Sequence, residues 1–211
     1  MKQRIQHLLI AATALCLCGC ASTSIKQSFK APGYQGGPVQ KVAVVAVADR
    51  GEVRQGFENR FVRDLRATGQ EATTTFDLLG LPEIKADKAA AAARLGAAGT
   101  TAVLVVRLVD QATYSREVQA TSERWVPTVS GYAGYGWYDC YSVAFMNLGT
   151  TWGSTTQKVY LDTSLFDLKT GQRLWSALTL TSLKEESDRL AEVDSLITKV
   201  VAAMRQDGLV R

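Results

Sequence analysis

KVAVVAVA, at residues 41–48, is a continuous apolar run, and TAVLVVRLV, at residues 101–109, is a second one. Apolar runs of this length, without polar alternation, are typical of strands that are covered on both faces by helices. Helical patterns lie between the two runs. The sequence therefore predicts an α/β domain whose core strands are parallel.

The segment between the two runs reads as helix, strand and helix. In residues 52–67, Val53, Phe57, Phe61 and Leu65 recur at steps of four and predict one buried helix face. Val62 lies beside these positions, and the other face carries charged residues that are expected to be solvated. They are Arg54, Glu58, Arg60, Arg63, Asp64 and Arg66.

Residues 70–76 are β-prone, Pro82 is expected to break the chain, and Asp87 is expected to cap an alanine-rich helix over residues 88–95. Further on, residues 157–168 and 173–183 predict a β-hairpin with Gly171 in its turn. A stripe of apolar residues from Leu190 to Met204 predicts a C-terminal helix. The expected fold is thus α/β with a mixed sheet of about five strands (βαβαβ, then a hairpin and a C-terminal helix) and with helices packed on it.

A glycine-rich and aromatic insertion, about residues 125–157, precedes the hairpin. Glycine disfavours both a stable helix and a long strand there. Exposed aromatic rings suit stacking on sugars, binding a peptide or entering a membrane interface. The same rings could instead fold back over one sheet edge, and both interpretations stay open. The candidate binding residues are Tyr132, Tyr135, Trp137, Tyr138, Tyr141 and Trp152.

The first twenty residues have the layout of an export signal. A basic start is followed by an apolar run over residues 8–17, which is too short to span a membrane permanently. Leu17 and Gly19 before Cys20 resemble a bacterial lipobox. The resemblance implies cleavage before Cys20 and lipidation of its thiol. An ordinary cleaved signal without lipid, or an uncleaved N-terminal helix, is the alternative.

Three parts of the chain follow from this interpretation. Residues 1–19 are the expected signal peptide, residues 20–40 the lipidated cysteine and a flexible tether with a mean span of about 25 Å, and residues 41–211 a single periplasmic domain. Ala21 stands where an aspartate would hold a lipoprotein in the inner membrane. We therefore expect an anchor in the outer membrane that faces the periplasm.

Composition excludes several function classes. Cleavage would remove His7, the single histidine of the sequence, so catalysis that depends on histidine and the usual zinc sites are not expected, and neither is a cofactor. Removal of Lys2 and Arg4 leaves 22 basic against 20 acidic residues, which disfavours nucleic acid as a partner. Cys140 would remain as a single thiol, whose fate stays open.

The lipobox, the apolar first strand and LFDLKTGQRLW at residues 165–175 together resemble a group of periplasmic lipoproteins with a domain similar to the N-terminal domain of TolB. The group includes the curli secretion lipoprotein and LpoB, the activator lipoprotein of a penicillin-binding protein. The resemblance implies a membrane-held domain that is no catalyst.

The expected function is therefore a binding or assembly module for an envelope protein or a cell-wall component such as peptidoglycan. One alternative is a subunit of an oligomeric outer-membrane secretion complex. Another is a hydrolase that uses paired carboxylates, for which Asp162 and Asp167 are the best-placed acids. The oligomeric state is left open by the sequence.

Overall fold

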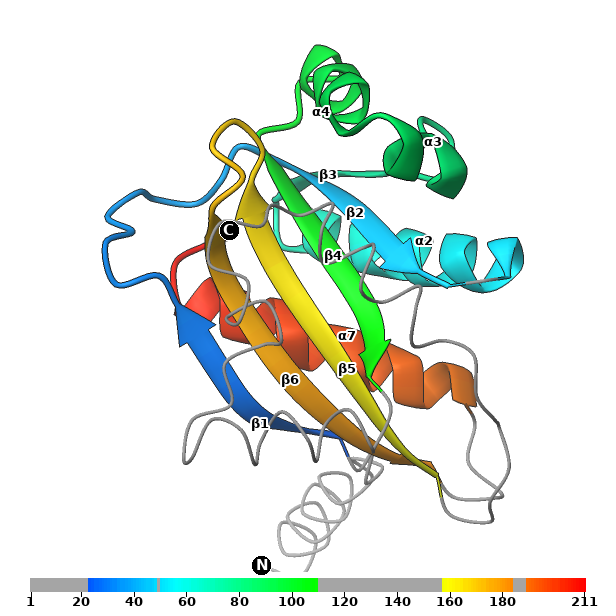
Figure 1. Ribbon diagram of the computed structural model, residues 1–211. Helices are drawn as coiled ribbons and strands as arrows, with labels where there is room; N and C mark the ends of the chain where they lie inside the picture. The colour runs from blue at the N-terminus through cyan, green and yellow to red at the C-terminus, as the bar shows by residue number, and fades with distance from the viewer. Residues whose placement is uncertain (1–22, 49, 110–156, 184–188) are drawn as a thin grey trace, which may run out of the picture.

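The computed structural model describes residues 23–48, 50–109, 157–183 and 189–211 (Figure 1). The strands are β1 (Thr23–Lys30), β2 (Lys41–Val47), β3 (Glu71–Thr74), β4 (Ala102–Val109), β5 (Gln157–Asp167) and β6 (Arg173–Leu183). The helices are α2 (Gly51–Ala67), α3 (Leu81–Ala86), α4 (Lys88–Ala97) and α7 (Arg189–Gln206). The predicted α/β class is confirmed, with a six-stranded mixed sheet instead of about five strands.

The strand order in the sheet is β1-β6-β5-β4-β2-β3. The first apolar run, residues 41–48, forms β2, which pairs in parallel with β3 on one side and with β4 on the other. The other neighbouring pairs are antiparallel. The continuous apolar runs therefore identified the parallel part of the sheet correctly, and the predicted hairpin supplies its antiparallel part.

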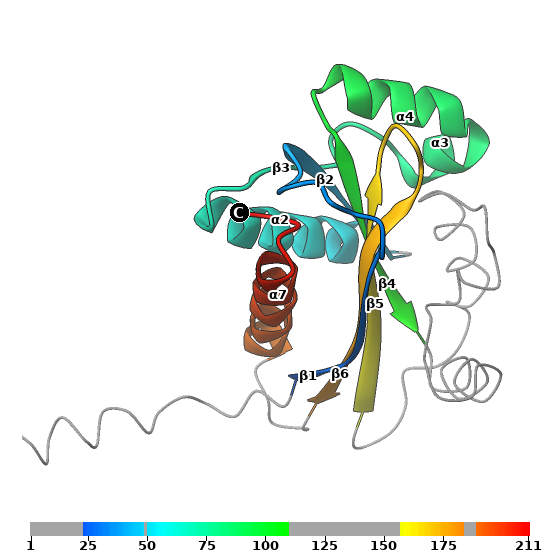
Figure 2. The same cartoon turned by 90° about the vertical axis from the view of Figure 1, so that its left-hand side faces the viewer.

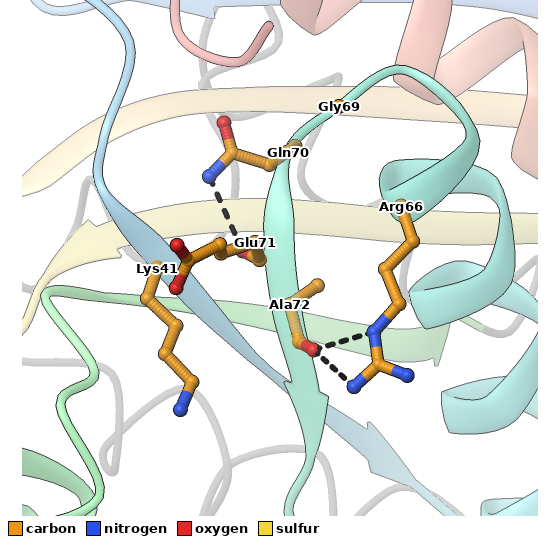
Figure 3. A pocket seen from close by; sticks show the side chains of 6 residues that line it. All are labelled: Lys41, Arg66, Gly69, Gln70, Glu71 and Ala72. Carbon is orange, nitrogen blue, oxygen red and sulfur yellow. Dashed lines mark hydrogen bonds between the residues drawn. The ribbon is translucent and has the colours of Figure 1, made fainter.

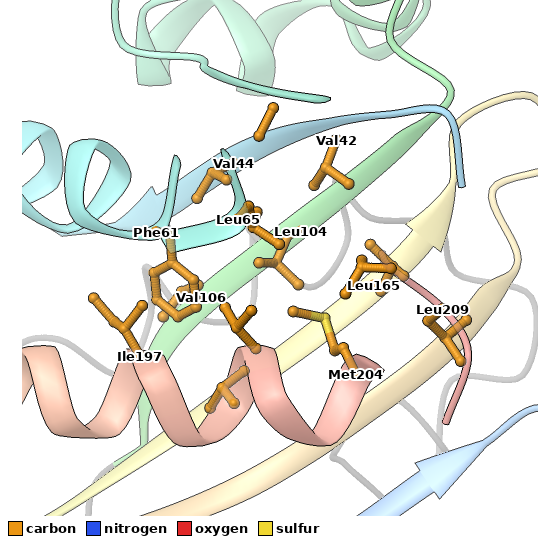
Figure 4. Packing of buried hydrophobic residues seen from close by; sticks show 14 of the residues in the cluster. Val42, Val44, Phe61, Leu65, Leu104, Val106, Leu165, Ile197, Met204 and Leu209 are labelled. Carbon is orange, nitrogen blue, oxygen red and sulfur yellow. The ribbon is translucent and has the colours of Figure 1, made fainter. Parts of the chain in front are cut away.

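Helices α2 and α7 cover one face of the sheet (Figure 2). The main core lies between them and the strands (Figure 4), and Trp175 of β6 is fully buried in it. The indole Nε1 of Trp175 donates a hydrogen bond to Asp207 Oδ2 at 2.7 Å, just beyond the end of α7. The labelled core residues of Figure 4 are Val42, Val44, Phe61, Leu65, Leu104, Val106, Leu165, Ile197, Met204 and Leu209.

Helices α3 and α4 pack on the opposite face, over β2 and β4, where Ile84 and Leu95 are fully buried. The predicted cap of α4 is confirmed, because Asp87 Oδ1 accepts a hydrogen bond from the Ala90 N–H at 2.9 Å. Helix α3 was not predicted. Pro82 lies in its first turn, where a missing N–H costs no hydrogen bond, so the proline starts a short helix there.

The hairpin of β5 and β6 has the expected turn. Gly171 has φ of +70°, and the Thr170 N–H donates to Asp167 Oδ1 at 2.7 Å.

Among the described residues, no helix is both long enough and apolar enough to cross a membrane.

Strand β1 corrects the tether predicted over residues 20–40. Residues 23–30 are not a free coil but pair antiparallel with β6 at the edge of the sheet. Ile25 packs against the main core, and the Arg173 guanidinium lies 5.0 Å from the centre of the Phe29 ring. These contacts explain why a largely polar segment joins the sheet.

Candidate functional site

The lipidation and binding candidates of the sequence lie outside the described part of the chain. This applies to the lipidation candidate Cys20 and to all six aromatic candidates, Tyr132, Tyr135, Trp137, Tyr138, Tyr141 and Trp152. Their roles stay predictions.

A hollow of about 320 Å³ lies beside the edge strand β3 (Figure 3). It forms where α2 ends and the chain turns through Gly69, whose φ is +84°, into β3. The residues that line it are Lys41, Arg66, Gly69, Gln70, Glu71 and Ala72.

The polar side chains of this hollow hold the surrounding backbone together. Arg66 donates from Nε and Nη2 to the carbonyl oxygen of Ala72, at 3.0 and 2.8 Å (Figure 3). Lys41 Nζ donates to the Ala98 carbonyl at 2.7 Å. The Gln70 amide donates to the Val39 carbonyl at 2.9 Å and accepts from the N–H of Arg211 at 3.2 Å. Gln70 thus joins the segment before β2 to the end of the chain.

The lining of the hollow is largely polar and charged. Its lining supplies two cations, one carboxylate and one amide, and none of these six residues is a serine, cysteine or histidine. Within the described ranges no group of three histidine, cysteine or acidic side chains is placed to hold a metal ion.

A buried ion pair lies where α2 meets the ends of β2 and β3. Arg54 Nε donates to Glu58 Oε1 at 2.7 Å, and the two residues are only 3% and 0% exposed. The expectation that both lie on a solvated helix face is wrong. Val53, expected in the core, is instead 37% exposed. Four-residue spacing of opposite charges was a signal in the sequence, but that spacing is also common on exposed helix surfaces.

A second buried ion pair joins β4 to β5. Arg107 Nε donates to Asp162 Oδ2 at 2.7 Å, and the hydroxyl of Ser164 donates to Asp162 Oδ1 at 3.1 Å. Asp167, by contrast, accepts hydrogen bonds from the Thr170 backbone and hydroxyl in the hairpin turn. The two acids proposed for a hydrolase are thus five residues apart on β5, about 16 Å along the strand, and each has a structural partner.

Charged side chains also connect α2 to α7. Asp194 Oδ1 accepts from Arg60 Nη1 at 2.6 Å and from Arg63 Nη2 at 2.9 Å. Partial desolvation raises the pKa of Asp194, but the hydrogen bonds from the two arginines outweigh it and hold the pKa below its ordinary value. The Thr198 hydroxyl donates to Asp64 Oδ2 at 2.9 Å and completes the contact.

We expect Asp194→Asn to lower the free energy of unfolding by less than about 1 kcal/mol at pH 7, because the ion pairs of Asp194 with Arg60 and Arg63 are partly exposed. A lowered pKa in the folded state means that the stabilisation is present above the unfolded value of about 4 and is lost as the pH falls through the folded value. Urea unfolding of both proteins between pH 7 and pH 3 measures this. Asp77→Asn, at an exposed acid, is the control. A difference between wild type and Asp194→Asn that stays constant over this range would refute the assignment.

No protein-family model matches the chain, and no curated protein matches it. Among solved structures, a PelC dodecamer from Paraburkholderia phytofirmans aligns with 90% of this chain and 99% of its own, at 14% identity and a TM-score of 0.48. Lipoprotein GNA1162 from Neisseria meningitidis aligns with 79% of this chain and 99% of its own, at 14% identity and a TM-score of 0.41. No residue role follows from these likenesses.

Proposed function

We propose that the chain is an exported lipoprotein, cut before Cys20 and held by lipid in the outer membrane, facing the periplasm. There it acts as a binding or assembly module for an envelope protein or a cell-wall component. The observation that carries the proposal is the lipobox-like stretch of residues 17–20, LCGC, directly after an apolar run of export length. We also propose that the chain is related to the group of lipoproteins that includes the curli secretion lipoprotein and LpoB.

Two of the buried carboxylates in the described part of the chain have structural partners. Glu58 and Asp162 are buried and neutralised by Arg54 and Arg107. A buried carboxylate in an ion pair is engaged in holding the fold, and general acid or base work needs a group that reaches the substrate. The aromatic insertion around residues 131–153 is our candidate for the surface that contacts the partner.

The anchor is tested by Cys20→Ser in cells that are supplied with radiolabelled palmitate. We expect the variant to lose the label and to move from the membrane fraction to the soluble fraction, because a lipid is the main membrane attachment in this proposal. Cys140→Ser is the matched control and should keep both the label and the location. A Cys20→Ser protein that stays in the membrane would contradict the proposed anchor.

The binding surface is tested in the same cells by crosslinking. We expect Tyr135→Ala combined with Trp137→Ala to remove partner bands that wild type shows, because the aromatic faces are lost. Phenylalanine at the same two positions keeps aromatic faces and should keep the bands. Identical partner sets for wild type and the alanine variant would exclude these two side chains as binding groups.

A further inference from the structure

Strand β1 begins at Thr23, and this first residue of the strand has firm contacts. Thr23 is 5% exposed and lies opposite Thr181 of β6, with the two hydroxyl oxygens 2.9 Å apart. Lys199 of α7 donates from Nζ to the Thr23 carbonyl. Thr23 is therefore fixed to both the sheet and the helix layer that covers it.

The distance from Cys20 to this fixed point is short. Three residue steps span at most about 11 Å even when the chain is fully extended. The tether predicted from the sequence would have let the domain stand about 25 Å from the lipid. The backbone of Cys20, which would carry the lipid, thus lies within about 11 Å of the first residue of β1, whatever the conformation of the link.

Two further strand ends lie at the same end of the sheet as Thr23. Strand β6 ends beside the start of β1, and β5 starts beside the end of β6, with Gln157 opposite Leu183. Figures 1 and 2 both place these strand ends at the lower end of the domain. The turn after β5, with the exposed Lys169, lies at the other end, eleven residues or about 35 Å along the strand.

We propose that the end of the sheet where β1 starts lies against the phospholipid headgroups and that the turn between β5 and β6 points away from the membrane. The proposal rests on lipidation of Cys20. Its partner is the bilayer that holds the acyl chains. Lys26, exposed in β1 three residues after Thr23, is placed to face anionic headgroups.

Two exposed lysines provide a matched pair of probes. Lys26→Cys and Lys169→Cys are each made in lipidated, full-length protein that also carries Cys140→Ser, and each is labelled with a fluorophore. The proteins are placed in vesicles of phosphatidylethanolamine and phosphatidylglycerol with a quencher on a fraction of the headgroups. We expect quenching at least about twofold stronger at position 26 than at position 169, because Lys26 lies only about 10 Å along β1 from Thr23, whereas the turn lies about 35 Å from that end of the sheet. Equal quenching, or stronger quenching at position 169, would overturn the proposed orientation.

A lengthened link tests the cause of the difference. Ten Gly/Ser residues inserted before Thr23 should bring the two quenching values close together, because the domain then leaves the surface. A difference that persists unchanged in the lengthened protein would show that the short link does not set the orientation.

Mass spectrometry of each sample separates this inference from the proposed function. If the protein carries no lipid, the proposed anchor fails, and the orientation fails with it. If the lipid is present but the two positions are quenched equally, the orientation alone fails and the anchor stands. Circular dichroism shows whether the labelled variants keep the fold.

Discussion

Glu58→Ala is expected to lower the free energy of unfolding by about 3–5 kcal/mol, because it leaves the Arg54 charge buried without its partner. The carboxylate of Glu58 is fully buried and does more than pair with Arg54. Its Oε2 atom accepts hydrogen bonds from the N–H groups of Thr75 and Phe76, at 2.8 and 2.7 Å. Its Oε1 atom accepts from the N–H of Ala46 in β2 at 3.2 Å.

These hydrogen bonds take the place of strand pairing beyond the end of β3. Strand β3 ends at Thr74, opposite Val44, so the N–H of Ala46 lies beyond the end of its neighbour in the sheet. Buried backbone donors need an acceptor, and a carboxylate supplies two oxygens at once. In Glu58→Ala the three N–H groups lose this acceptor together with Arg54, which also donates to the Thr75 hydroxyl and the Leu79 carbonyl.

Urea unfolding followed by circular dichroism measures the effect. A loss of 3–5 kcal/mol corresponds to a midpoint about 1.5–2.5 M lower, for a slope near 2 kcal/mol/M. Glu52→Ala, an acid on the same helix with a 69% exposed side chain, is the control and should change the free energy by less than about 0.5 kcal/mol. Similar losses for Glu58→Ala and Glu52→Ala would contradict the role given to the buried carboxylate.

The parts of the fold that the sequence predicts are those that depend on local pattern. Residues 41–48 and 101–109 could be assigned to covered strands because apolar residues fill both faces of them. The Asp87 cap and the Gly171 turn are equally local, since each depends on one side chain or one backbone angle.

What the sequence did not predict depends on partners distant in the chain. Strand β1 is a strand because β6, about 150 residues later, supplies hydrogen bonds and a surface for Ile25 and Phe29. Its polar composition alone is typical of a linker. The burial of Glu58 likewise follows from the length of β3, which a helical pattern over residues 52–67 does not contain.

Arg107 is a signal in the sequence that could have predicted its partner. A charged residue inside an otherwise apolar strand is costly unless a buried partner neutralises it, so TAVLVVRLV indicates an acid on a neighbouring strand. The structure identifies that acid as Asp162, directly opposite on β5.

Asp162→Leu is expected to cost about 3–5 kcal/mol of unfolding free energy, since Arg107 then keeps a buried charge without this carboxylate. Arg107→Met leaves the Asp162 charge unpaired and should cost a similar amount. The double variant removes both charges. We expect it to regain most of the loss, because apolar residues of similar volume often replace a buried ion pair at little net cost.

Unfolding free energies of wild type, both single variants and the double variant form a double-mutant cycle that measures the coupling directly. Losses that simply add in the double variant would show that the pair is not coupled. The double variant also tests whether binding needs the Asp162 carboxylate. A hydrolase needs the ionisable carboxylate, whereas a binding module needs only the fold that the pair supports. A stable double variant that still forms the crosslinks of wild type would show that binding needs only the fold, and a stable one that loses them would show that binding needs the charged pair itself.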